Sequence, residues 1–105
     1  QLDGYNPEEF IPFDIHWSLT ACLKIENGKI LDNVWLTHTD AEDIRDMEVT
    51  IEEYLTLAYQ AKGFHYWQLI YILKEECDFH ELMKRFLPKM VPHVELDLSE
   101  FGIDL

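Results

Sequence analysis

The chain has 105 residues, 48% of them hydrophobic, which is enough for the core of one domain over residues 1–105. Its 21 acidic residues outnumber 8 basic ones, so the formal net charge is −13. This charge argues against direct binding to nucleic acid or to an anionic membrane, because both are recognised mainly through Lys and Arg. It favours a basic protein partner, attracted over long range, or simply a well-solvated surface.

The two cysteines, Cys22 and Cys77, are too few for a disulfide framework, so reduced thiols in a cytoplasmic protein are expected. No apolar run approaches the roughly 20 residues that span a bilayer. The acidic and polar start, QLDGYNPEEF, does not have the pattern of a signal peptide. Because the chain does not begin with Met, we expect that an earlier segment was removed or belongs to a longer protein.

The first half of the chain predicts a long β-hairpin over about 13–39. Residues 1–12 are expected to be irregular, because Pro7 and Pro12 disfavour a helix interior and a central strand. Apolar and polar residues alternate from Phe13 to Glu26, which predicts one long strand with a buried face. The dipeptide Asn27-Gly28 then predicts a tight turn, since both residues tolerate positive φ.

A two-residue loop defines the register of this hairpin. It places Glu26 opposite Lys29, a favourable charge pair. It also pairs apolar residues with one another along one face: Ile25 with Ile30, Ala21 with Val34, and Leu19 with Leu36. Asp32 opposite Leu23 is the one mismatch, which predicts a bulge or an edge position and leaves the far end of the register open.

The second half predicts helices over about 50–75 and 79–87. After a polar, acidic connector over 37–49, Thr50 and Glu53 have the spacing of a capping box. Gly63 either ends a first helix or lies inside a longer, kinked one. Asp78 and Glu81 repeat the capping pattern before the second helix.

The second helix is expected to stop at Pro88. Residues 88–105 then read as an extended tail, with a short edge strand where Val94, Leu96 and Leu98 alternate with acids.

The segment QAKGFHYWQLIYIL, residues 60–73, combines a histidine with four aromatic side chains. Helical spacing places His65 one turn from Ala61 and Leu69. No second ligand or base lies three or four residues away, so we expect His65 to be a hydrogen-bonded core residue rather than a catalytic one.

No motif predicts catalysis, a cofactor or a metal. Cys77 and His80 form one candidate zinc pair, whereas a structural site needs two. Residues 40–48 lack the alternating Asp/Asn positions and the glycine of an EF-hand loop. The four glycines are scattered and form no phosphate loop. We therefore expect a protein that is not an enzyme, with a small hydrolase as the less favoured alternative.

Two segments carry a resemblance to a known family. VTIEEYLTLAYQAKGFHYWQLIY (49–71) and FLPKMVPHVELDLSEF (86–101) resemble the C-terminal part of SUKH-superfamily proteins. The matching patterns are (S/T)xEEYL at 50–55, A(K/R)GFxYWQ at 61–68 and FLPxxxP at 86–92. The resemblance covers roughly half of the chain, and the hairpin ending ILDNVWL suits the family's sheet. Members usually begin with a helical segment carrying a Leu-Pro motif, which 1–12 lacks, so this chain would be a truncated or divergent member.

In bacteria this superfamily is dominated by immunity proteins of polymorphic toxin systems. The resemblance therefore implies a binding module that neutralises a toxin. Toxin domains that attack nucleic acids are commonly basic, so an acidic inhibitor can occlude their phosphate-binding cleft. The alternative is a structural or regulatory interaction domain whose partner is not a toxin.

Members use different surfaces for different toxins, so the resemblance assigns no binding residues. From charge we expect the partner to contact the acidic connector and the helix start after it, although a solvated surface is the alternative. The expected partner-binding residues are Asp40, Glu42, Asp43, Asp46, Glu48, Glu52 and Glu53. The predicted architecture is α+β, an antiparallel sheet built on the long hairpin with the C-terminal helices packed on one face.

Overall fold

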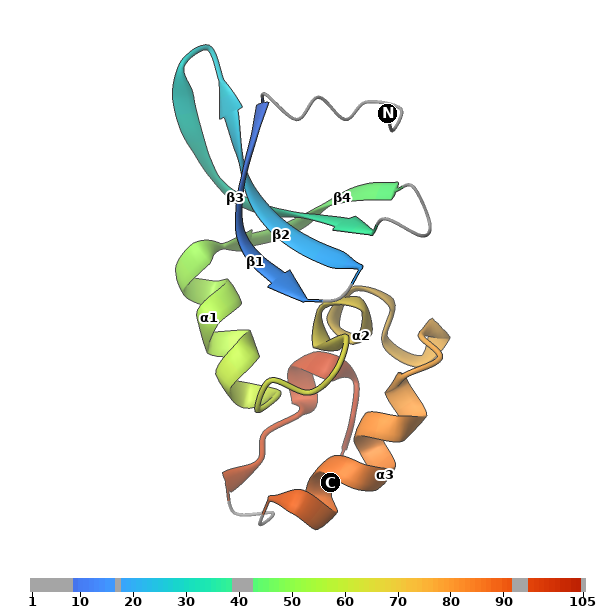
Figure 1. Cartoon of the computed structure of the whole chain (residues 1–105). Coiled ribbons are helices and arrows are strands. Elements are labelled where there is room, and N and C mark those ends of the chain that lie inside the picture. Colours follow the sequence, from blue (N-terminus) through green and yellow to red (C-terminus); the bar gives the residue numbers. More distant parts are fainter. Residues whose placement is uncertain (1–8, 17, 39–42, 92–94, 105) are drawn as a thin grey trace. The chain divides into compact units, whose positions relative to one another are not determined.

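The computed structural model describes residues 9–16, 18–38, 43–91 and 95–104 (Figure 1). The chain divides into two compact units, Gln1–Tyr54 and Leu55–Leu105. A four-stranded antiparallel sheet is followed by helices, which confirms the predicted α+β class. The single domain and the packing of the C-terminal helices on one face of the sheet stay predictions.

The sheet has the strand order β1-β2-β3-β4, and every neighbouring pair is antiparallel. Its strands are β1 (Phe10–His16), β2 (Leu19–Glu26), β3 (Lys29–His38) and β4 (Asp43–Thr50). The prediction that residues 10–12 are irregular was wrong. They belong to β1, because Pro12 lies on an edge strand, where a missing N–H is tolerated.

The predicted single strand from Phe13 to Glu26 is in fact two strands, which reverse direction between His16 and Leu19. The alternation of apolar residues continues across this reversal and so conceals it. Because His16 pairs with Leu19, and Ile15 with Thr20, the odd positions of β2 share a face with the even positions of β1 next to the turn. Ile15, which the alternation assigned to the core, is 72% exposed as a result.

The register of the β2–β3 hairpin confirms the predicted bulge. Next to the turn the predicted pairs are present: Glu26 with Lys29, and Ile25 with Ile30. The register then shifts between Ile25 and Leu23, so that Val34 rather than Asp32 lies opposite Leu23. Ala21 consequently meets Leu36, and the predicted pairings beyond the bulge were wrong by two residues. The shift takes the charged Asp32 out of the ladder and buries Val34 in its place.

The acidic segment 37–49, predicted as a connector, contains most of β4 instead. Met47 and Val49 are buried, whereas Asp46 and Glu48 between and beside them are exposed. This is a strand with one buried face, and the acids on its outer face make its two buried apolar residues hard to recognise in the sequence. Glu48 has φ 59, and it marks a second bulge, where the β3–β4 register shifts.

Helix α1 (Ile51–Gln60) begins with the predicted capping box. The Thr50 N–H donates to Glu53 Oε1 at 2.9 Å, and the Glu53 N–H donates to Thr50 Oγ1 at 3.2 Å. The helix ends before Gly63, as one of the two alternatives proposed. It ends in a Schellman motif, with Lys62 at the left-handed position and the Gly63 N–H donating to the Ala58 carbonyl at 3.0 Å.

His65 lies in the turn before helix α2 (Trp67–Leu73) and is exposed, so its prediction as a core residue was wrong. Tyr66 has a left-handed backbone, with φ 58, so the helix does not extend back to His65. The helical spacing that predicts a core position therefore does not apply to His65. The centre of the His65 ring lies 4.0 Å from the centre of the Tyr66 ring and 5.6 Å from that of the Phe79 ring.

Helix α3 (His80–Met90) differs from its prediction at both ends. Its N-cap is Phe79, which makes no side-chain capping hydrogen bond, rather than Asp78. Pro88 lies inside the last turn and does not stop the helix. A proline there removes only one backbone donor, and the Val91 N–H still donates to the Leu87 carbonyl at 3.0 Å.

The described part of the tail, 95–104, contains no strand, and the expected edge strand is not present there; Val94 lies outside the described residues. Instead, the 3₁₀ helix η4 (Ser99–Phe101) places Phe101 and Ile103 in the core of the second unit. The His80 ring Nε2 lies 3.3 Å from the Gly102 carbonyl oxygen, and this contact helps to hold the tail.

Candidate functional site

The negative charge of the chain is concentrated in its first unit. Residues 1–54 hold 13 acidic and 3 basic residues, a formal charge of −10. Residues 55–105 hold 8 acidic and 5 basic residues, a formal charge of −3. A basic partner is therefore attracted mainly to the first unit.

The predicted partner-binding acids are distributed over two elements. Asp40 and Glu42 lie outside the described residues, and Asp43 begins β4 opposite His38. The other four are exposed on the outer face of β4 and the first turn of α1: Asp46, Glu48, Glu52 and Glu53. Their role in binding stays a prediction.

Two of these carboxylates stabilise the backbone. Asp46 accepts a hydrogen bond from the Glu48 N–H at 2.8 Å and contacts Asn33 Nδ2 at 3.2 Å and 3.3 Å through its two oxygens. Glu53 is part of the capping box. Removing either carboxylate would therefore alter the local fold as well as the charge. Of the four exposed acids, Glu52 lines a pocket in the first unit that is formed with residues of β2 and β3.

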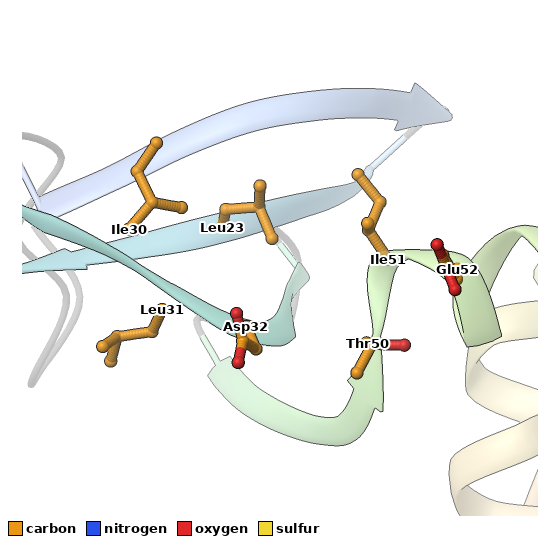
Figure 2. A pocket seen from close by; sticks show the side chains of 7 residues that line it. All are labelled: Leu23, Ile30, Leu31, Asp32, Thr50, Ile51 and Glu52. Carbon is orange, nitrogen blue, oxygen red and sulfur yellow. The ribbon is translucent and has the colours of Figure 1, made fainter.

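That pocket has a volume of about 320 Å³ and combines apolar and acidic side chains (Figure 2). Its apolar lining comes from β2, β3 and the first residue of α1: Leu23, Ile30, Leu31 and Ile51. Asp32 and Glu52 contribute carboxylates, and Thr50 completes the lining. Ile30 and Ile51 remain 57% and 37% exposed, so the apolar surface of the pocket is open to a partner.

The β3 bulge explains why a pocket forms at this point. One residue of β2, Lys24, faces three residues of β3 between the flanking pairs, so Asp32 leaves the ladder. In a regular hairpin Asp32 would lie directly opposite Leu23. In the bulge Asp32 has no partner in β2, and it lines the pocket together with Leu23 and Glu52.

The partner-binding residues expected from the sequence include Glu52 but not Asp32. The mismatch of Asp32 with Leu23 was the available signal, because a charge retained opposite an apolar residue often marks a bulge with a local function. By itself the mismatch predicts a bulge or an edge position, and it does not predict a pocket. The pocket also depends on Thr50 and Ile51, whose proximity to Asp32 follows from the pairing of β4 with β3.

The described residues contain no group of three or more His, Cys, Asp or Glu side chains that could hold a metal ion. Burial raises the pKa of the Cys22 and Cys77 thiols, which favours the protonated form over a nucleophilic thiolate. Within the same described ranges, no helix has the length and apolar character needed to cross a bilayer.

Helix α3 presents a surface of different chemistry, which sequence reasoning also missed. Leu82, Phe86 and Met90 are exposed at four-residue spacing. The Arg85 guanidinium carbon and Lys89 Nζ lie 5.8 Å and 5.7 Å from the centre of the Phe86 ring. This apolar ridge with basic neighbours suits an acidic partner rather than a basic one.

Comparisons of the chain with protein-family models, with curated proteins and with solved structures give no match.

Proposed function

We propose that the chain is a non-enzymatic protein-binding module, an immunity protein that neutralises a basic toxin in the cytoplasm. The acidic first unit supplies the binding surface. The observation that carries the proposal is the pocket that Asp32 and Glu52 line together with the exposed side chains of Ile30 and Ile51. Protein interfaces typically combine an apolar anchor with a charged surround of this kind.

The charge and the pocket have separate roles in this proposal. The formal charge of −10 on the first unit accelerates encounter with a basic protein and weakens as salt is added. The apolar lining then slows dissociation through the burial of Ile30 and Ile51, an interaction that salt does not screen. A nuclease-type toxin bound in this way would have its phosphate-binding cleft covered by carboxylates.

The test is co-expression with the polymorphic-toxin domain encoded beside the gene, with growth and pull-down at low and high salt as readouts. Wild type should rescue growth and form a salt-sensitive complex. The double charge reversal Asp32→Lys/Glu52→Lys should abolish both. Glu75→Lys/Glu81→Lys, at two exposed acids of the second unit, changes the net charge equally and should retain rescue. A toxin that neither binds nor is neutralised by wild type would rule out the proposal.

The exposed ridge on α3 favours a second candidate function, an interaction domain for an acidic partner other than a toxin. Its basic neighbours, Arg85 and Lys89, would repel the cationic cleft of a nuclease. Replacing Phe86 with Ser should then abolish partner capture, whereas Asp32→Lys/Glu52→Lys should not. The opposite pattern supports the toxin-binding surface.

A further inference from the structure

We infer that the pocket between β2, β3 and the start of α1 recognises one arginine side chain of the partner. The inference rests on the proposed function and names the chemistry of its contact. The lining contains four aliphatic side chains, two carboxylates and Thr50, and none of these seven residues is basic. This composition complements a side chain that has an apolar stem and a cationic end.

The size and apolar lining of the pocket suit the stem of such a side chain. Its volume of about 320 Å³ is near the lower end of the roughly 300–1,000 Å³ typical of ligand pockets. Such a space admits one long side chain but not a large cofactor. In the view of Figure 2, Leu23 lies between Ile30 and Ile51 and offers an aliphatic surface to the three methylenes of an arginine.

The acidic residues select the cationic end. Asp32 comes from the β3 bulge and Glu52 from the first turn of α1, so the carboxylates approach the pocket from different elements. Displacing water with an apolar anchor alone would cost the desolvation of charged groups, a cost that a cationic group offsets. A guanidinium pairs with a carboxylate through two donors of its planar fork, which a lysine ammonium cannot reproduce with the same geometry.

The test is an NMR titration of the whole chain, in which the methyl signals of Leu23, Ile30 and Ile51 are followed. The probes are N-acetyl-arginine methylamide, its lysine counterpart, and the citrulline analogue, which has nearly the shape of arginine but no charge. Arginine should shift these methyl signals with at least about threefold higher affinity than lysine. Citrulline should shift them little at the same concentration. Citrulline binding equal to that of arginine, or a preference for lysine, overturns the inference.

Matched substitutions locate the contact. Asp32→Asn and Glu52→Gln keep the shape of exposed side chains, so the fold should persist while arginine affinity falls about threefold in each. The same removal of one charge from the exposed Glu81 on α3 should leave the affinity unchanged. If all three variants bind arginine equally, the pocket is not its site.

Failure of this inference can be separated from failure of the proposed function. A toxin complex whose affinity is unchanged in Asp32→Asn/Glu52→Gln overturns arginine recognition in the pocket but leaves toxin binding in place. Arginine binding to the pocket without any toxin complex overturns toxin neutralisation and leaves the recognition chemistry. The two outcomes come from different measurements, a pull-down and a titration.

Discussion

The hydroxyl of Tyr54 donates a 2.6 Å hydrogen bond to Asp14 Oδ2, which joins the first turn of α1 to β1. The Phe13 ring packs edge-on against the same tyrosine, with ring centres 5.2 Å apart. Successive residues of a regular strand point to opposite faces, so Phe13 and Asp14 would not both reach Tyr54. The bulge between Pro12 and Asp14 directs both onto it.

This contact predicts that removal of the Tyr54 hydroxyl lowers the stability of the protein. Tyr54 is 1% exposed, and Tyr54→Phe removes a donor from the half-buried Asp14 carboxylate. We expect the free energy of unfolding, measured by urea denaturation, to fall by about 1–2 kcal/mol. Tyr59→Phe is the matched control, because Tyr59 is 71% exposed. Equal losses in the two variants would contradict a role for the Tyr54–Asp14 hydrogen bond.

The capping box of α1 predicts a second effect. Thr50→Ala removes the oxygen that accepts from the Glu53 N–H and should lower the free energy of unfolding by about 1 kcal/mol. Thr50→Ser keeps that oxygen and should retain most of the stability. Urea denaturation of the two variants measures the difference. If Ser and Ala are equally destabilising, the lost methyl group rather than the cap is responsible.

The parts of the fold that could be predicted from the sequence depend on residues close together along the chain. Thr50 and Glu53 are three residues apart, and Asn27-Gly28 is a dipeptide, so each signal specifies its own structure. The reversal between His16 and Leu19 has no such signal. The alternation passes through it without a break, and the odd positions of β1 change face.

The candidate site could be predicted only in part, because it combines residues distant in sequence. Glu52 belongs to an obvious acidic cluster, and Asp32 was identified as a mismatch in the hairpin. Their common pocket requires β4 to pair with β3, and the sequence predicts a connector in place of β4 because its buried residues, Met47 and Val49, lie among acids. A strand with a strongly charged outer face is easily mistaken for a loop.

Lys74 predicts a third effect, in the second unit. Its Nζ donates to the backbone carbonyls of Tyr71 and Glu100 and lies 4.0 Å from the centre of the Tyr71 ring, so it ties the end of α2 to the tail. Its backbone has φ 52 and ψ −127, a conformation that costs a non-glycine residue about 1–3 kcal/mol. The side chain thus stabilises a position that its own backbone disfavours.

Substitutions at Lys74 separate these two contributions. Both Lys74→Ala and Lys74→Gly lose the ammonium contacts, and amide hydrogen exchange of residues 98–103 should become faster in both. Lys74→Gly also relieves the backbone, so it should be more stable than Lys74→Ala by about 1 kcal/mol. Glycine ordinarily lowers stability relative to alanine by about 0.5–1 kcal/mol. If urea denaturation shows Lys74→Gly to be less stable than Lys74→Ala, the backbone strain at Lys74 is contradicted.

The buried thiols predict how stability changes at alkaline pH. Burial raises the pKa of Cys22 and Cys77 above the ordinary value of 9.0. Above about pH 9 the unfolded chain has therefore released protons that the folded protein still holds, and this lowers the free energy of unfolding as pH increases. Lys74 contributes with the opposite sign, because burial lowers its pKa below 10.5, an effect that Glu100 partly offsets.

The double variant Cys22→Ala/Cys77→Ala isolates the thiols, because Lys74 is the same in both proteins. Between pH 8 and pH 10, its free energy of unfolding should decline less steeply than that of wild type, as measured by urea denaturation at each pH. In the folded wild type a disulfide reagent such as Ellman's reagent should react slowly at pH 8, because both thiols are buried, and rapidly once urea is added. Parallel pH profiles for the two proteins, together with fast modification of the folded state, would mean that both cysteines reach solvent and ionise at their ordinary pKa.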